Sequence, residues 1–135
     1  MTLYLDASAL VTLHIDTPAR ADLVAIVIAE PEPVVTCALT LVEALALIDR
    51  VTDEPVMRRE LEDHIRLTWD RLAIVPIDHA CLDEAARLMR EQPLRLSDAI
   101  HLAATSRLPR PVRFATFDPA QITVALGLGC EIVSN

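Results

Sequence analysis

The sequence has 135 residues, with twenty acidic and twelve basic side chains and a formal net charge of −8, and this length fits one domain. Hydrophobic residues make up 53% of the chain, which excludes a disordered, low-complexity or collagen-like protein. The basic residues are all arginines, so the chain cannot form a Walker A phosphate loop or a pyridoxal Schiff base, both of which need lysine.

Hydrophobic patterning and the breaks at proline predict strands that alternate with helices. In chain order, the elements are a strand at 2–6, helices at 7–14 and 19–30, a strand at 33–37, helices at 39–50 and 56–71, a strand at 72–77, a helix that Asp78 caps and that runs to about Glu91, a helix that starts near Ser97, a strand at 113–117, a helix at 119–126 and a strand at 130–133. This alternation implies right-handed crossovers and a parallel sheet of about five strands. We therefore predict an α/β fold with three α/β/α layers.

Two acidic residues follow predicted strands at the edge where parallel α/β sheets bind ligands. Asp6 ends the first strand and Asp118 ends the fourth. If these strands are neighbours, they lie about 4.8 Å apart, and carboxylates that close repel each other unless a cation lies between them. Each residue could instead cap a helix, and Asp118 has Pro119 and Gln121 in the positions that a capping box favours.

Two further aspartates lie at predicted helix starts. Asp98 follows Ser97, where the helix dipole alone would favour a carboxylate. Asp78 also ends a strand and begins a helix. We assign Asp78 to capping and keep Asp98 as a candidate site residue.

Glu43 lies inside the apolar helical segment ALTLVEALALI. A carboxylate in such surroundings costs several kcal/mol unless it is paired or bound to a metal. An ion pair with an arginine is one explanation, and metal binding together with Asp6, Asp98 and Asp118 is the other. Carboxylate oxygens select hard ions such as Mg²⁺ or Mn²⁺ rather than zinc.

The chain contains, in this order, the segments LYLDASALV, LVEALAL, LRLSDAIHLAAT, FATFDPA and CEIV. Together they resemble a PIN-domain ribonuclease, and above all the VapC toxins of VapBC toxin–antitoxin pairs. The resemblance covers essentially the whole chain and implies a single PIN domain over residues 1–135 with the strand order 3-2-1-4-5. It implies catalytic, metal-binding carboxylates at Asp6, Glu43, Asp98 and Asp118, with Ser8 and Thr116 beside the site.

The same resemblance implies a metal-dependent endoribonuclease that is the toxin of a type II toxin–antitoxin pair. Mg²⁺, or alternatively Mn²⁺, would be the cofactor, RNA the substrate, and a VapB-like antitoxin and a second copy in a homodimer the partners. The cysteines Cys37, Cys81 and Cys130 are odd in number and far apart, which indicates reduced thiols in a cytoplasmic protein. No apolar run reaches the length of a membrane span.

Arginines would have to supply the phosphate contacts, because the acidic balance argues against a broad basic surface. The candidates are the cluster Arg107, Arg110 and Arg113 and the arginine-bearing face of the helix at 56–71, although such groups are more often solvated surface. His101, one turn after Asp98, could support the metal site from behind its ligands, but we favour a packed and hydrogen-bonded histidine.

Two other function classes fit parts of the sequence. A phosphatase of the haloacid-dehalogenase kind also begins with a strand and an aspartate, but it needs a second aspartate where this chain has Ser8. A non-catalytic Rossmann-like binding module would use the acids as helix caps and Glu43 in an ion pair. Metal titration separates this module from the nuclease, because the module predicts no effect of Mg²⁺ or Mn²⁺ on the melting temperature.

Overall fold

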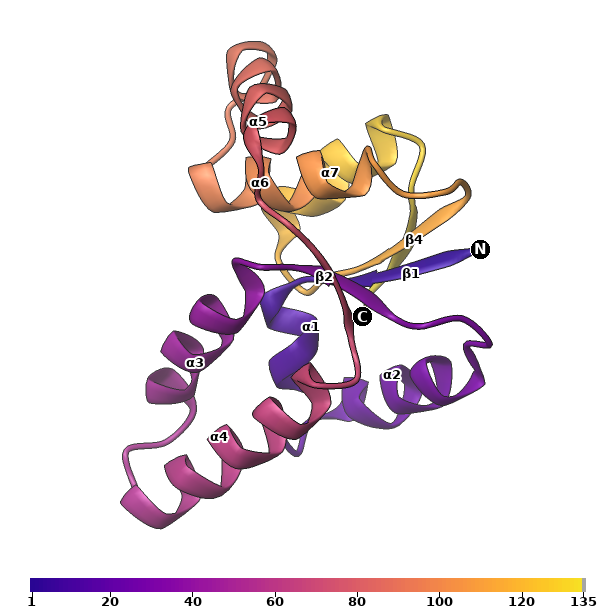
Figure 1. Ribbon diagram of the computed structural model, residues 1–135. Helices are drawn as coiled ribbons and strands as arrows, with labels where there is room; N and C mark the ends of the chain where they lie inside the picture. Colours follow the sequence, from indigo (N-terminus) through magenta and orange to yellow (C-terminus); the bar gives the residue numbers. More distant parts are fainter. Residues whose placement is uncertain (135) are drawn as a thin grey trace.

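Five parallel strands form one sheet in the order β3-β2-β1-β4-β5, with β1 at its centre (Figure 1). In the computed structural model, which describes residues 1–134, the strands are β1 (Thr2–Leu5), β2 (Val35–Cys37), β3 (Ala73–Val75), β4 (Val112–Ala115) and β5 (Glu131–Val133). The predicted strand order 3-2-1-4-5 is therefore confirmed. Asn135, the last residue of the predicted domain, lies outside the described residues.

Helices cover both faces of this sheet. They are α1 (Ala7–Thr12), α2 (Pro18–Ala29), α3 (Thr40–Val51), α4 (Pro55–Trp69), α5 (His79–Glu91), α6 (Leu96–Thr105) and α7 (Pro119–Gly127). Helices α1 to α4 lie on one side of the sheet and α5 to α7 on the other (Figure 1). The predicted three-layer α/β/α architecture is thus confirmed.

The central strand β1 contributes to the hydrophobic core on both sides of the sheet. Leu3 and Leu5 pack into the layer of α1 to α4, whereas Tyr4 packs into the layer of α5 to α7. All three side chains are fully buried, as expected where successive side chains of a strand point to opposite faces. The residue after β1 is consequently held at the centre of the sheet's carboxyl edge.

Helix α6 is buried from Asp98 to Thr105. Such burial suits a helix that is apolar on all sides, and the alanines of this one let it lie close to the sheet. The helix also carries Asp98 and His101 into the interior. Because buried polar groups need hydrogen-bond partners, these two residues are tied to the structure around them.

All five strands are shorter than the sequence predicts, and β2 and β3 differ most. Strand β2 begins at Val35 rather than at residue 33, and β3 ends at Val75 rather than at residue 77. Pro33 and Pro76 flank these strands. Proline lacks the N–H group that would extend a hydrogen-bonded ladder, so pairing stops next to it.

The cysteines and the helices bear on the two remaining expectations, which concern free thiols and membrane spans. The three cysteines are free and buried, which confirms the expected thiols. Within residues 1–134, every helix is too short or too polar to cross a membrane.

Candidate active site

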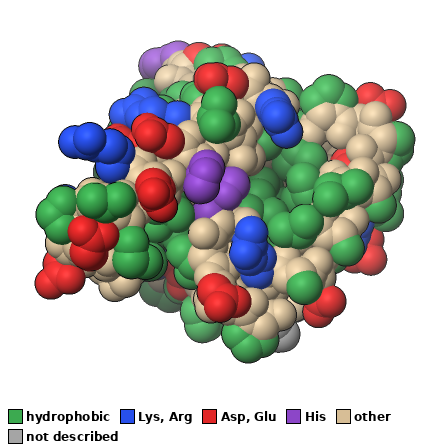
Figure 2. Space-filling model, turned by 90° about the horizontal axis from the view of Figure 1, so that it is seen from below, with side chains coloured by type: hydrophobic (Ala, Val, Ile, Leu, Met, Phe, Trp, Pro, Cys, Tyr) green, Lys and Arg blue, Asp and Glu red, His purple; other side chains and the backbone are tan. Residues whose placement is uncertain are grey.

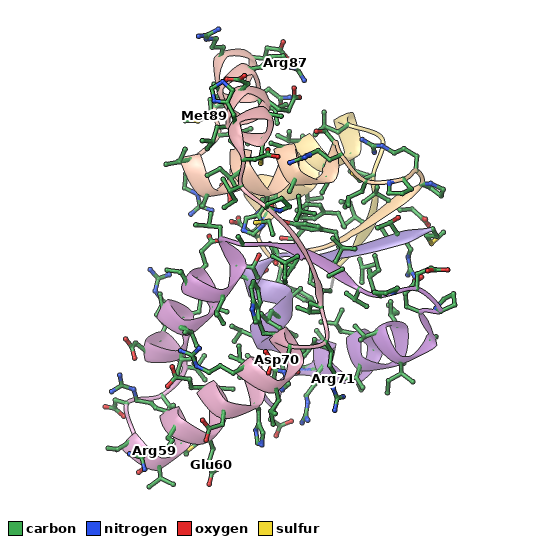
Figure 3. The ribbon with its side chains drawn as sticks, in the orientation of Figure 1. Arg59, Glu60, Asp70, Arg71, Arg87 and Met89 are labelled. Atoms are coloured by element: carbon green, nitrogen blue, oxygen red, sulfur yellow. The ribbon has the colours of Figure 1, made fainter. Side chains whose placement is uncertain are left out.

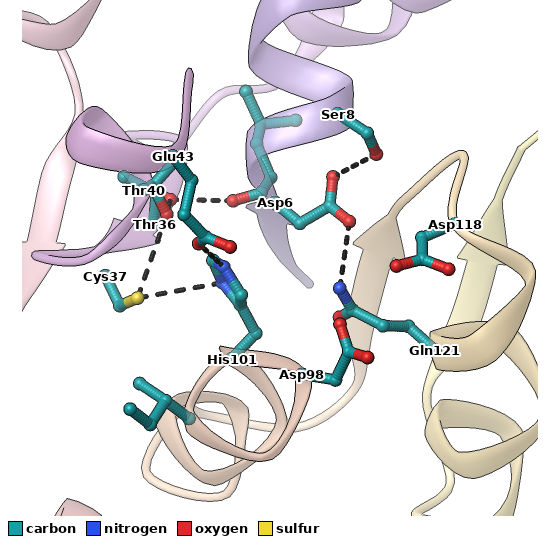
Figure 4. Close-up of polar contacts among 12 residues, drawn as sticks. Asp6, Ser8, Thr36, Cys37, Thr40, Glu43, Asp98, His101, Asp118 and Gln121 are labelled. Atoms are coloured by element: carbon teal, nitrogen blue, oxygen red, sulfur yellow. Dashed lines mark hydrogen bonds and ion pairs between the residues drawn. The ribbon is translucent and has the colours of Figure 1, made fainter. Parts of the chain in front are cut away.

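The four candidate carboxylates line one pocket at the carboxyl edge of the sheet. Strands β1 and β4 are neighbours, with Leu5 paired to Ala115, so the residues that follow them meet at this edge. The pocket has a volume of about 500 Å³, and Figure 4 shows the carboxylates around it. They come from four separate places in the chain: Asp6, Glu43, Asp98 and Asp118.

Asp6 is buried and both of its oxygens accept hydrogen bonds. Oδ1 caps α1 by accepting from the N–H of Ala9 at 2.9 Å, and it also accepts from Ser8 Oγ at 2.6 Å. Oδ2 accepts from Thr116 Oγ1 at 2.5 Å and from Gln121 Nε2 at 3.2 Å. Burial raises the pKa of Asp6, while the hydrogen bonds from Ser8, Thr116 and Ala9 oppose that rise. The capping role is therefore real, but it involves only one of the two oxygens.

Ser8 and Thr116 join the ends of β1 and β4 at the site. Ser8 Oγ donates to Asp6 and accepts from the N–H of Phe117 at 2.9 Å. Thr116 Oγ1 donates to Asp6 and accepts from the N–H of Asp118 at 3.0 Å. Each hydroxyl thus uses its donor on the buried carboxylate and its lone pair on the backbone after β4.

Glu43 is paired with a histidine, not with the arginine that the sequence suggested as its ion-pair partner. Its Oε1 lies 2.5 Å from His101 Nε2, and the Nδ1 of that ring lies 2.7 Å from the hydroxyl of Tyr4. Burial alone would lower the pKa of His101, but its hydrogen bonds to Cys37 and Glu43 outweigh burial and raise it to about 10. His101 is 1% exposed, so the prediction of a packed, hydrogen-bonded histidine is confirmed.

Asp98 and Asp118 are bridged by one guanidinium group. Arg95 donates from Nε to Asp98 Oδ2 at 2.8 Å and from Nη2 to Asp98 Oδ1 at 3.3 Å, and the same Nη2 contacts Asp118 Oδ2. Asp118 also caps α7 by accepting from the N–H of Ala120 at 3.0 Å. The predicted capping-box partner, Gln121, instead turns its amide toward Asp6.

Arg95 and Gln121 are thus site residues that the sequence did not single out. Arg95 lies three residues before Asp98, a spacing at which opposite charges meet along a helix. That spacing could have pointed to Arg95. Gln121 gave no such signal, because its contact with Asp6 joins residues far apart in the chain.

The arginine candidates from the sequence lie elsewhere. Arg107 pairs with Asp78 at 2.7 Å, and Arg110 contacts the sulfur of Cys130 at 3.6 Å. Arg59 and Arg71 project outward from the layer of α1 to α4, away from the sheet (Figure 3). The arginines that line the pocket are Arg50 and Arg95.

The donor set fits a hard divalent cation in its chemistry and charge. The pocket presents carboxylate oxygens, which suit Mg²⁺ and Mn²⁺, and Gln121 adds a buried amide oxygen that has no hydrogen-bond partner among the described residues. Within residues 1–134, no three His, Cys, Asp or Glu side chains are grouped tightly enough to hold a metal ion. The cation between Asp98 and Asp118 is instead the guanidinium of Arg95.

Comparisons with known proteins agree on the fold. The family model described as "PIN domain" matches residues 3–133. A toxin–antitoxin complex from Klebsiella pneumoniae has a TM-score of 0.70 at 18% identity over 98% of this chain and 96% of that one. Mycobacterium tuberculosis VapC20, described as a sarcin-ricin loop cleaving toxin, has a TM-score of 0.70 at 16% identity over 91% of this chain and 95% of that one.

Rickettsia felis VapBC2, bound to a DNA fragment from its promoter, has a TM-score of 0.68 at 10% identity over 100% of this chain and 99% of that one. Identities this low show a shared fold and nothing more. A search of curated proteins gave no match.

Proposed function

The chain belongs to the PIN domain family, and from this premise we propose that it is a metal-dependent endoribonuclease. The observation that carries the proposal is the convergence of four carboxylates on one pocket at the carboxyl edge of the sheet. Ligands of open α/β sheets bind at such an edge. Phosphodiester hydrolases that use Mg²⁺ or Mn²⁺ hold the ion with a set of carboxylates.

In this proposal Asp6, Glu43, Asp98 and Asp118 hold the metal, directly or through water. When bound, a divalent ion would supply an activated water and would neutralise charge on the phosphate and the leaving oxygen. The chain's own contribution is to position the ligands. Ser8, Thr116 and Gln121 fix the orientation of Asp6, and His101 fixes that of Glu43.

Phosphate binding would rest on few groups. Figure 2 shows basic side chains scattered among acidic and hydrophobic ones over the face seen from below, without a continuous basic surface. The net charge of −8 also weakens long-range attraction of RNA. Arg50 and Arg95, which line the pocket, are therefore the proposed phosphate contacts.

We further propose that the protein is the toxin of a type II toxin–antitoxin pair, a single PIN domain that forms a homodimer in the cytoplasm and binds a VapB-like antitoxin. Support comes from structures with the same fold, among them the Klebsiella pneumoniae toxin–antitoxin complex and VapBC2. An antitoxin that covered the carboxylate pocket would block access of RNA to it.

A second candidate function is a non-catalytic binding module with the same fold. Asp6 and Asp118 do cap helices, and Glu43 does make a pair with a buried histidine. These contacts are what such a module requires. It differs from the nuclease in predicting no change in melting temperature on addition of Mg²⁺ or Mn²⁺.

The test is an RNA cleavage assay with a matched pair of aspartate variants. Asp6→Asn alters the pocket, whereas Asp78→Asn alters a residue that likewise follows a strand and caps a helix but does not line the pocket. Purified wild-type protein and Asp78→Asn should cleave members of a broad RNA panel with Mg²⁺ or Mn²⁺ and lose this activity in EDTA. Asp6→Asn should be inactive.

Induced expression extends the test to cells. Wild type and Asp78→Asn should arrest growth with discrete RNA cleavage, and Asp6→Asn should not. A metal-loaded wild-type protein that leaves the whole RNA panel intact and has no effect on growth would contradict the proposal.

A further inference from the structure

The proposed active site contains a cation of its own. Arg95 lies just before α6, and its guanidinium contacts the carboxylate of Asp98 through two nitrogens, at 2.8 and 3.3 Å. The second of these nitrogens also contacts Asp118, at the start of α7. One side chain therefore joins two carboxylates that come from different helices.

We propose that Arg95 is an internal counter-ion that competes with divalent metal for Asp98 and Asp118. This inference rests on the proposed function, because it concerns the same metal site. Two carboxylates that face one pocket repel each other unless a cation lies between them. The guanidinium meets that need in the metal-free protein, and a divalent ion that binds both carboxylates has to displace it.

The exposure of the three side chains shows which of them would move. Arg95 is 67% exposed, whereas Asp98 is 3% and Asp118 is 25% exposed. An ion pair whose cation is so exposed is weak, and the flexible arginine stem can leave without opening a cavity. The buried carboxylate stays in place while the guanidinium moves out to solvent.

The contact between Glu43 and His101 provides a contrast within the same pocket. His101 is 1% exposed and held by Tyr4 and Glu43, so this cationic partner is fixed by packing. A divalent ion can therefore displace Arg95 but not His101. Arg95 is therefore the cationic side chain of the pocket that can move away when a metal binds.

The experiment is calorimetric titration of Mn²⁺ into EDTA-stripped full-length protein, and it needs no RNA. The variants are Arg95→Gln, Arg95→Lys and Arg50→Gln. Arg50 is the matched control because it lines the same pocket, while no ion pair joins it to another residue within 1–134. Circular dichroism of each metal-free variant checks that the fold is retained.

We expect Arg95→Gln to bind Mn²⁺ about fivefold more tightly than wild type. Arg95→Lys should lie between the two, because lysine keeps the charge but lacks the planar fork that contacts a carboxylate through two nitrogens. Arg50→Gln should stay within about twofold of wild type. If Arg95→Gln failed to fold, Arg95→Lys would still show tighter binding than wild type.

Three outcomes would overturn the inference. These are equal Mn²⁺ affinity in Arg95→Gln and wild type, weaker affinity in Arg95→Gln, and an equal gain in Arg50→Gln, which would mean a general effect of charge. Absence of Mn²⁺ binding in every variant would overturn the metal site of the proposed function as well. Tighter binding by Arg95→Gln in a protein that cleaves no RNA would support the counter-ion and remove only the nuclease.

Discussion

His101 and Glu43 are joined by a hydrogen bond of 2.5 Å between the imidazole Nε2 and the carboxylate Oε1. The contact connects α6 to α3 at the carboxyl edge of the sheet. It also accounts for two residues that are unusual in apolar helices, since each compensates the other for burial. The carboxylate lines the pocket, so this pair contributes to both stability and the proposed site.

The first prediction concerns the pH dependence of this pair. Since the pKa of His101 is raised from 6.5 to about 10, its stabilising effect is complete below about pH 6.5 and is lost as the pH rises through about 10. Glu43→Gln removes the negative charge and should lower the free energy of unfolding by about 1.5 kcal/mol at neutral pH. Urea unfolding of both proteins should show this difference shrinking as the pH rises toward about 10.

Glu62→Gln is the control for this measurement. Glu62 pairs with Arg66 on the surface of α4, and exposed pairs contribute little. The stability of Glu62→Gln should therefore stay close to that of wild type at every pH measured. A Glu43→Gln deficit that did not change with pH would contradict an ion pair with charged His101.

The second prediction is that Asp6→Asn stabilises the metal-free protein. Burial raises the pKa of Asp6 despite its hydrogen bonds, so the ionised carboxylate is less favourable in the folded chain than in the unfolded one. The gain should be about 1 kcal/mol at neutral pH. It should shrink as the pH falls and vanish below 3.8, the reference pKa, since both states then carry the proton.

Asp78→Asn should have the opposite sign in the same thermal unfolding experiment. The N–H of Cys81 and the guanidinium of Arg107 lower the pKa of Asp78, so its ionised form favours folding at neutral pH. This variant should melt below wild type while Asp6→Asn melts above it. Equal shifts of the same sign would show that Asp6 acts as a cap alone.

The fold could be predicted from the sequence because its signals are local and periodic. The crossovers that follow β1, β3 and β4 each carry a hydrophobic pattern and an aspartate at the start of the helix, and parallel sheets restrict how such units connect. The strand order came from the resemblance to PIN domains rather than from periodicity. That order places the ends of β1 and β4 side by side and so brought Asp6 and Asp118 into one candidate site.

The supporting contacts of the site could not be predicted in the same way. Gln121 reaches Asp6 across 115 positions of the chain, and Arg95 reaches Asp118 across 23. The sequence neighbours Asp118 and Pro119 predict a capping-box role for Gln121. Its amide instead turns to the buried carboxylate of Asp6, because that carboxylate needs hydrogen-bond donors. The arginine candidates Arg107, Arg110 and Arg113 lie near β4 in the sequence, but proximity in the sequence does not tell which side chains reach the pocket, and the arginines that line it are Arg50 and Arg95.

The third prediction tests Gln121 as a positioning residue. Its Nε2 donates to Asp6 Oδ2 at 3.2 Å. Side chains that hydrogen-bond to a metal-binding residue and so orient it typically contribute about tenfold or more to metal affinity. Gln121→Ala should therefore weaken Mn²⁺ binding about tenfold in calorimetry. Gln92→Ala is the control, since Gln92 follows the last residue of α5 and does not line the pocket. Equal affinity in the two variants would exclude this role for Gln121.

The last prediction separates arginines that contact RNA from those that do not. Arg50 lines the pocket, whereas Arg113 belongs to β4 and does not line it. A phosphate contact that is equal in substrate and transition state changes KM and leaves kcat unaltered. With a short cleavable RNA, Arg50→Ala should raise KM about tenfold, and Arg113→Ala should match wild type.

Salt dependence provides a second readout of the same pair. Loss of one phosphate contact should reduce the slope of log affinity against log salt by about one. The titration is made in the catalytically inactive Asp6→Asn background, in which RNA stays intact. Adding Arg50→Ala to this background should reduce the slope. If Arg113→Ala lowered the slope and Arg50→Ala did not, RNA would bind around Arg113 rather than at the carboxylate pocket, and that pocket could not be the cleavage site.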